Sequence, residues 1–244
     1  MARYDLNADV GEGFDDAAML AVVSSANVAC GFHAGEPETM RAVCRAAVRH
    51  EVAIGAQPSY RDREGFGRRP VEIEYAVLVA DLVEQVETLR AAAAEVGGTV
   101  RYLKPHGALY HRVGDDPEQA SAVVEVCRRY GLPLLALPHS EIVVQAARAG
   151  VRVAREFFAD RAYDSRGRLV GRAEPESLVT DPEQVEARVR RLLADATVVA
   201  FDGGVVRAEA DSICVHGDSP GAEALARAVR RAVEGSGADV AAFA

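Results

Sequence analysis

The sequence predicts an α/β fold, a distorted (β/α) barrel of the TIM type with about seven or eight strands. Short apolar runs alternate with longer amphipathic segments along the whole chain, as in parallel strands joined by crossover helices. No GxGxxG motif follows the first apolar run, which disfavours a dinucleotide-binding sheet. No linker or compositional break interrupts the 244 residues, so we expect one barrel domain over residues 1–244.

The expected strands are short apolar runs bounded by polar or glycine-rich segments. They cover residues 4–9, 27–31, 52–57, 100–106, 132–137, 151–157, 197–201 and 212–216. The segment 201–211 is rich in glycine with polar alternation, and it predicts a hairpin insertion that makes the barrel irregular at this point.

The expected helices show an apolar periodicity of about 3.6 residues. They cover residues 16–24, 37–50, 74–97, 117–130, 140–149, 182–194 and 222–233. Three of these segments begin with a proline, which is favoured in a first helical turn. Three are followed or ended by a glycine suited to a left-handed cap, namely Gly97, Gly131 and Gly150.

Charge and composition argue against several classes of partner. The net charge is −9 and is mixed along the chain, whereas nucleic acids and anionic membranes attract basic patches. No run of about 18 apolar residues could span a membrane, and the N-terminus lacks the apolar stretch of a signal peptide. Four cysteines are scattered without CxxC spacing, as in a protein with reduced thiols. We therefore expect a cytoplasmic protein.

Polar residues follow most of the predicted strands, at the point where each strand ends. The carboxyl ends of parallel barrel strands meet on one face, where barrel enzymes place their chemistry. On the first strand, Asp5, Asn7 and Asp9 alternate at period two and so point to one side, the barrel interior. Burying three polar groups is costly unless they bind each other or a ligand, so the alternatives are a hydrogen-bonded plug and a binding site.

Three histidines each end a strand and precede a small residue: His33, His106 and His216. Together with Asp9 they predict either a divalent metal site of the histidine and carboxylate type, or a metal-free acid–base site. Asp9, His33 and His106 are the candidate metal ligands. The spacing does not decide between these alternatives.

Lys104 is the one lysine among 28 basic residues, and all the others are arginine. Lysine is a compact and titratable cation, whereas arginine is a permanently charged planar fork. Lys104 stands beside His106 at a strand end, so we expect it to serve the site. The chain has no GxxxxGK[ST] motif, which excludes a Walker-type nucleotide site. Arg69 and Arg161 lie in strand-end loops, and their guanidinium groups suit a substrate carboxylate or phosphate.

Long motifs along nearly the whole chain resemble the LamB/YcsF family of bacterial 5-oxoprolinase subunits. They are DLNAD at 5–9, GEG at 11–13, SANVACGFHAG at 25–35, GFGRR at 65–69, KPHGALY at 104–110, FADR at 158–161 and CVHGD at 214–218. The resemblance implies a distorted barrel related to glycoside hydrolases and sugar deacetylases. It also implies ATP-dependent opening of 5-oxo-L-proline to L-glutamate, with ATP as co-substrate and with subunits B and C as partners.

The matching positions give the expected site. The catalytic candidates are Asp9, His33, Lys104, His106 and His216, and the substrate-binding candidates are Asp5, Asn7, Arg69, Asp160 and Arg161. Three positions depart from the pattern that many relatives show: Gln57 and Tyr102 stand where histidine is frequent, and His111 stands where asparagine is frequent. Gln57 puts one potential metal ligand in doubt, since an amide cannot shuttle a proton.

We expect Lys104 to stabilise negative charge that develops on the lactam or phosphate oxygens. Two other functions remain open at this point. One is a metal-dependent carbohydrate deacetylase on the same barrel, active without ATP or partners. The other is a non-catalytic subunit whose strand-end cluster only captures ligand.

Overall fold

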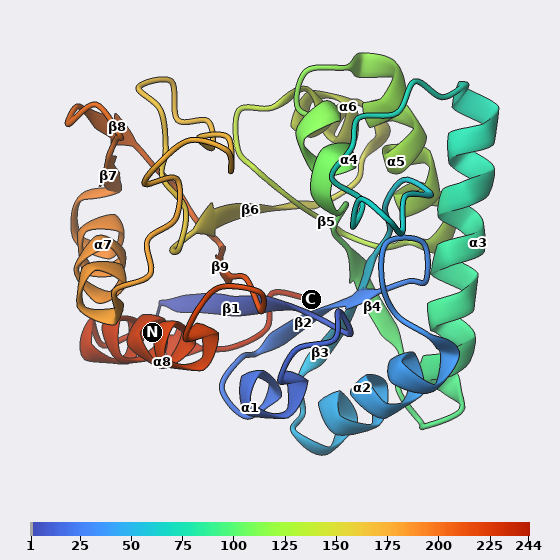
Figure 1. The fold of residues 1–244 in the computed structure, drawn as a ribbon, viewed down its shortest axis with the longest axis horizontal. Coiled ribbons are helices and arrows are strands. Elements are labelled where there is room, and N and C mark those ends of the chain that lie inside the picture. Colours follow the sequence, from blue (N-terminus) through green and yellow to red (C-terminus); the bar gives the residue numbers. More distant parts are fainter. Residues whose placement is uncertain (1) are drawn as a thin grey trace.

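The computed structural model describes residues 2–244, which form the ten strands and eight helices of Figure 1. The strands are β1 (Arg3–Val10), β2 (Ser25–Ala29), β3 (Ala53–Gln57), β4 (Val100–Leu103), β5 (Leu134–Ala136), β6 (Val153–Phe158), β7 (Thr197–Val199), β8 (Val205–Arg207), β9 (Ser212–Val215) and β10 (Asp239–Val240). The helices are α1 (Asp16–Leu20), α2 (Pro37–Arg49), α3 (Tyr75–Ala94), α4 (Gly107–Arg112), α5 (Pro117–Tyr130), α6 (Glu141–Ala149), α7 (Pro182–Asp195) and α8 (Ala222–Gly235).

Within residues 2–244, seven parallel strands close into a barrel in the order β1-β2-β3-β4-β5-β6-β9. Closure comes from β1, which pairs with β2 along one edge and with β9 along the other. The two-residue strand β10 extends the barrel at the start of β1, beside Arg3 and Tyr4. The predicted α/β barrel is therefore confirmed, with seven strands in its wall.

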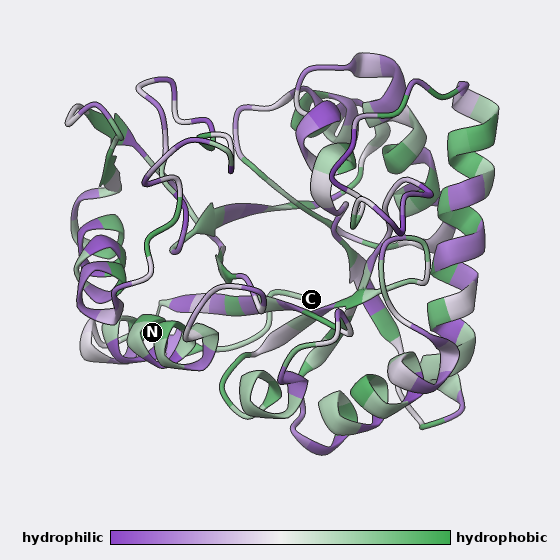
Figure 2. Cartoon of the chain, in the orientation of Figure 1, coloured by the Kyte–Doolittle hydropathy of each residue, from purple (hydrophilic) through white to green (hydrophobic). Residues whose placement is uncertain are grey.

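The expected strand at 197–201 does not belong to the barrel. Its residues form β7, which pairs antiparallel with β8 in a separate two-stranded hairpin. Gly203, with a φ of 84°, lies in the turn between them, where a left-handed backbone favours glycine. The hairpin prediction for 201–211 is confirmed in kind, and β9 takes the closing position instead. Figure 2 shows this hairpin as largely hydrophobic, and Val199, Phe201 and Val205 are exposed.

The helices surround the barrel, and α7 and α8 lie side by side (Figure 1). The prolines at 37, 117 and 182 occupy first turns as expected. Helix α1 is shorter than the expected 16–24 because Ser24 ends the segment, accepting a hydrogen bond from the Leu6 backbone N–H at 2.8 Å. Helix α4, which directly follows His106, and strand β10 were not expected from the sequence. None of the described helices is both long enough and apolar enough to cross a membrane.

The barrel interior is polar, and this follows from the alternation along β1. Leu6, Ala8 and Val10 belong to the hydrophobic core, whereas Asp5 and Asn7 form hydrogen bonds with side chains of neighbouring barrel strands. Successive residues of a strand point to opposite faces, so the apolar set packs under the helices and the polar set fills the barrel. The fold thus builds a column of buried polar groups that rises toward the carboxyl ends of the strands.

Candidate functional site

The lowest polar layer of the barrel is closed around Asp5. Its carboxylate accepts hydrogen bonds from Ser24 at 2.6 Å, from Ser25 at 2.7 Å and from Ser212. Burial raises the pKa of Asp5 to about 6, although these hydroxyls lower it in part. Asp5 is a hydrogen-bonded plug, and it lines neither of the two cavities at the strand ends, so the geometry does not support its expected contact with substrate.

The middle layer is an amide network. Asn27 donates to Asn7 Oδ1 at 2.7 Å and to Asp9 Oδ1 at 2.8 Å, and Asn7 donates to Ser212 Oγ at 2.7 Å. Tyr102 donates its hydroxyl proton to Asn27 Oδ1 at 2.6 Å. The tyrosine that stands in place of a frequent histidine therefore serves this network. Asn7 is fully buried and acts on the layer above rather than on a ligand directly.

Lys104 lies between two carboxylates in the upper layer. Its Nζ atom is 3.0 Å from Asp9 Oδ1 and 2.8 Å from Glu156 Oε1, the latter as an ion pair. A third contact joins Nζ to Cys214 Sγ at 3.3 Å. An ammonium group has three N–H donors, and these three contacts account for them. Lys104 therefore holds Asp9 and Glu156 in place and has no spare donor for the oxyanion role expected from the sequence.

The charges of this layer are fixed by mutual contact. Burial alone would lower the pKa of Lys104, but Asp9, Cys214 and Glu156 hold it well above its usual range. Burial would raise the pKa of Asp9, but Lys104, His216 and His106 hold it well below its usual range. At neutral pH the layer contains an ammonium ion beside an ionised aspartate.

His216 is oriented by Asp160, which lies behind it. The Asp160 carboxylate accepts from His216 Nδ1 at 3.0 Å, from the His216 backbone N–H at 3.0 Å and from Ser219 Oγ at 2.7 Å. Burial would raise the pKa of Asp160, but His216 and these donors lower it to about 2. A carboxylate that binds Nδ1–H leaves Nε2 as the ring's proton acceptor, the arrangement of a general base. Asp160 thus positions a histidine, and the geometry gives it no contact with a ligand.

His33 and His106 form a stacked pair, with ring centroids 3.8 Å apart and an interplanar angle of 6°. Glu12 Oε1 lies 3.3 Å from His33 Nε2 and 3.4 Å from His106 Nδ1. Burial lowers the pKa of both histidines, to about 4 for His106. The structure therefore groups the two expected metal ligands with Glu12, whereas Asp9 is bound by Lys104.

The loop after β3 covers this pair, and Arg69 anchors the loop. Arg69 Nε donates to Asp62 Oδ1 at 2.7 Å, and the Arg69 side chain is 60% exposed. Arg69 lines no cavity at the strand ends, so the geometry does not support its expected substrate contact. Phe66 has a φ of 56°, and its carbonyl oxygen accepts from His106 Nε2 at 3.0 Å. Strained backbone of this kind is frequent at functional sites.

A cavity of about 300 Å³ opens over the upper layer. Five of the expected site residues line it, namely Asp9, Lys104, His106, Arg161 and His216. The volume lies at the lower end of the range for small-molecule sites. The sequence-based expectation of one shared strand-end site therefore agrees with the geometry for these five residues.

Arg161 is the cation of this cavity that no carboxylate neutralises. It is 2% exposed, and among residues 2–244 no acidic side chain forms an ion pair with it. Its Nη2 donates to the Val170 carbonyl at 2.6 Å, and its Nε has no hydrogen-bond partner. Burial and the nearby Arg172 lower its pKa to about 10. By contrast, Arg68 and Arg172 pair with Asp218. Arg161 is thus available to an anionic ligand.

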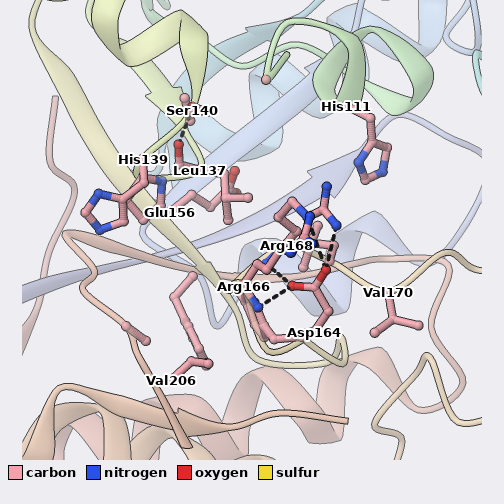
Figure 3. A pocket seen from close by; sticks show the side chains of 18 of the residues that line it. His111, Leu137, His139, Ser140, Glu156, Asp164, Arg166, Arg168, Val170 and Val206 are labelled. Carbon is pink, nitrogen blue, oxygen red and sulfur yellow. Dashed lines mark hydrogen bonds and ion pairs between the residues drawn. The ribbon is translucent and has the colours of Figure 1, made fainter. Parts of the chain in front are cut away.

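A larger cavity of about 860 Å³ adjoins the first and shares residues such as Tyr110 and His111 with it. Figure 3 shows Asp164, which accepts hydrogen bonds from Arg166 and Arg168 on one side of this space. Glu156, the partner of Lys104, also lines it. The two cavities therefore meet at the polar layer around Lys104.

Sequence reasoning missed two acidic residues of the site, Glu156 and Glu12. Both stood beside residues that were selected, Glu156 near the FADR motif and Glu12 within GEG. Glu156 is 1% exposed, and a carboxylate on a barrel strand that is buried needs a cation. Its position two residues before Phe158 on β6 is the signal that could have placed it inside the barrel.

Comparisons with known proteins agree with this geometry. The profile of the LamB/YcsF family matches residues 4–244. The chain is 51% identical to the A subunit of 5-oxoprolinase from Streptomyces griseus subsp. griseus, covering 98% of this chain and 99% of that one. It is 49% identical to the corresponding 5-oxoprolinase protein of Mycobacterium avium, with full coverage of both.

Solved structures show the same barrel. The lactam utilization protein from Thermus thermophilus is similar with a TM-score of 0.93 and 40% identity, covering 99% of this chain and all of that one. A family 4 carbohydrate esterase from Streptomyces lividans matches with a TM-score of 0.52 and 10% identity, covering 100% of this chain and 93% of that one. At that identity the likeness concerns the fold alone.

Proposed function

This chain belongs to the LamB/YcsF family, and we propose that it is the lactam-binding subunit of an ATP-dependent 5-oxoprolinase. The reaction is the opening of 5-oxo-L-proline to L-glutamate, coupled to ATP hydrolysis. Relatives of about half-identical sequence are named as one lettered subunit of 5-oxoprolinase, so a complex is expected, and we propose subunits B and C as the partners. No nucleic acid or membrane partner is proposed.

The observation that supports this function best is the small cavity with an unpaired cation on one wall and an oriented base on another. The carboxylate of 5-oxoproline would bind the guanidinium of Arg161 as a charge-assisted hydrogen-bonded pair. His216, held by Asp160 at 3.0 Å, would face the ring with its Nε2. Lys104, Asp9 and Glu156 form a rigid floor that fixes these groups.

A lactam is an unactivated amide, so its hydrolysis needs an activated carbonyl and a proton for the leaving nitrogen. ATP would transfer its terminal phosphoryl group to the lactam oxygen and release ADP. Water would then add to the ring carbon, His216 would take its proton, and cleavage of the C–N bond would deliver a proton to nitrogen. The γ-glutamyl phosphate so formed would release phosphate and L-glutamate on attack by a second water. Because the sequence has no Walker motif, we assign ATP binding to the complex as a whole.

The test is reconstitution. The chain is co-expressed with subunits B and C, and glutamate release from 5-oxoproline is measured with and without ATP. We expect release only with ATP and all three subunits, and a large loss on omitting this chain. Full turnover by B and C alone would overturn the proposal. Deacetylation of an acetylated sugar by the isolated chain, without ATP, would favour the deacetylase alternative instead.

A further inference from the structure

Glu12, His33 and His106 converge on one point at the carboxyl ends of the barrel strands. Glu12 follows β1, His33 follows β2 and His106 follows β4. One ligand atom from each residue, two ring nitrogens and a carboxylate oxygen, lies within 4.8 Å of the other two. The side chain of Glu12 is 3% exposed and that of His33 is fully buried, so water does not solvate them freely.

Hydrogen bonds fix the tautomer of each histidine. Ser59 donates its hydroxyl proton to the Tyr60 carbonyl at 2.8 Å, so its oxygen accepts from His33 Nδ1–H at 3.0 Å. The Phe66 carbonyl can only accept, so His106 donates through Nε2–H at 3.0 Å. In the neutral rings, His33 Nε2 and His106 Nδ1 are therefore lone pairs, and both face the Glu12 carboxylate. Burial lowers the pKa of both histidines, which keeps these lone pairs free at neutral pH.

Three acceptor atoms that meet without a donor need a cation between them. The distances of 3.3 Å and 3.4 Å from Glu12 Oε1 to the two nitrogens match an edge of a metal-ion tetrahedron. Bonds of about 2.0–2.1 Å to nitrogen and oxygen give ligand–ligand edges of about 3.3–3.4 Å. Metal-binding histidines commonly donate their other ring N–H to a protein oxygen, as His33 and His106 do.

A further buried group points to a ligand here. The side-chain amide of Gln57 is fully buried, and neither its nitrogen nor its oxygen has a hydrogen-bond partner among residues 2–244. It lies close enough to His33 to raise the pKa of that histidine. An unsatisfied buried amide is costly, and a bound ion with its water molecules would satisfy it.

We propose that Glu12, His33 and His106 bind one divalent transition-metal ion of the zinc class, with an open coordination position toward the cavity that His106 lines. Two histidines and one glutamate with an open position are a donor set of catalytic zinc sites. Such an ion polarises a carbonyl oxygen or lowers the pKa of bound water. The ring planes are parallel in this structure, and an ion must lie in the plane of each ring that binds it. Binding therefore requires the stack to tilt open.

Metal binding by the isolated chain tests the proposal. The chain is stripped with EDTA, dialysed and titrated with Co²⁺, followed by visible absorption, and with Zn²⁺, followed by calorimetry. We expect one ion per chain. Glu12→Gln and His33→Asn should each weaken binding more than about 100-fold, beyond the 10–100-fold effect of an outer partner such as Ser59. The control His139→Asn, in the larger cavity, should bind like the unaltered chain.

Two further results would decide the matter without relying on the folding of a variant. A crystal of the Co²⁺-loaded chain should show one anomalous peak between Glu12, His33 and His106, with the two rings no longer parallel. No binding by the stripped chain, or a peak on other residues, would overturn the proposal. Loss of binding in Asp9→Asn but not in Glu12→Gln would overturn the assignment of Glu12. Because no turnover is measured, these outcomes are independent of the lactam proposal.

Discussion

The ammonium nitrogen of Lys104 lies 3.0 Å from Asp9 Oδ1, although 95 positions separate the two residues in the chain. The contact crosses the barrel from the end of β4 to the end of β1. It explains why a chain rich in arginine uses lysine here. Asp9, Glu156 and Cys214 surround a compact cation, and a planar guanidinium is too large and too rigid to replace it.

Removal of the Lys104 charge should destabilise the fold. Lys104→Met leaves Asp9 and Glu156 buried without their cation, and breaking a buried pair in this way typically costs about 3–5 kcal/mol. We expect the free energy of unfolding, measured in urea, to fall by that amount. Arg61→Met, which removes an exposed partner of Asp81, is the control and should cost no more than about 1 kcal/mol. Equal losses in the two variants would contradict a buried, charge-paired lysine.

Asp5 should make stability depend on pH in a direction opposite to most carboxylates. Its pKa is raised from 3.8 to about 6, so the folded state binds the proton more tightly than the unfolded state does. The resulting stability is fully present below the unfolded pKa and is lost as pH rises through about 6. A shift of about two units corresponds to about 3 kcal/mol.

Denaturation of Asp5→Asn and the unaltered chain from pH 4 to pH 8 measures this effect. The variant should gain stability relative to the unaltered chain as pH rises, whereas Asp195→Asn, an exposed control, should not. A difference between Asp5→Asn and the unaltered chain that is constant with pH would show that Asp5 is ionised throughout.

The sequence predicted the barrel because alternating apolar runs and amphipathic segments carry the same information as the strands and helices themselves. The strand at 197–201 was assigned to the barrel because its apolar pattern does not reveal its partner. Pairing with β8 or with a barrel strand is decided by the turn at Gly203 and by β9, which fills the gap. Pairing between distant strands is a tertiary property, and local pattern is silent on it.

The site was predictable in its location and less so in its roles. Asp9, Lys104 and His216 were placed together because strand ends meet on one face of a barrel. Arg69 and Asp160 were assigned to substrate because the sequence shows charges but not their neighbours. Asp62 and His216 occupy those side chains in the structure.

Arg161 should control the affinity for 5-oxoproline. Arg161→Gln removes a charge-assisted hydrogen bond, worth about 1.5–3 kcal/mol, so KM should rise about 10–100-fold with little change in kcat. Steady-state kinetics of the reconstituted complex measure both. Arg61→Gln is the matched surface control. An unchanged KM in Arg161→Gln would mean that the substrate carboxylate binds elsewhere.

Asp160 should act on the chemical step through His216. In Asp160→Asn the amide no longer fixes the Nδ1–H tautomer, and kcat should fall by about 10²–10⁴ while KM changes little. The pH dependence of kcat should also lose the inflection that belongs to His216. Ser219→Ala, which removes a donor to the same carboxylate but keeps its charge, should have a much smaller effect. A normal pH profile in Asp160→Asn would contradict a positioning role.

The central claim is that Lys104 fixes the floor of the lactam site by its size as well as its charge. The most direct test is the rate of ATP-dependent glutamate release by the reconstituted complex with Lys104→Arg, checked for folding by circular dichroism. The displaced carboxylates should reduce turnover by about 10²-fold or more, close to the loss in Lys104→Met, while the surface exchange Arg61→Lys leaves turnover unchanged. Near-normal turnover with Lys104→Arg would contradict the account.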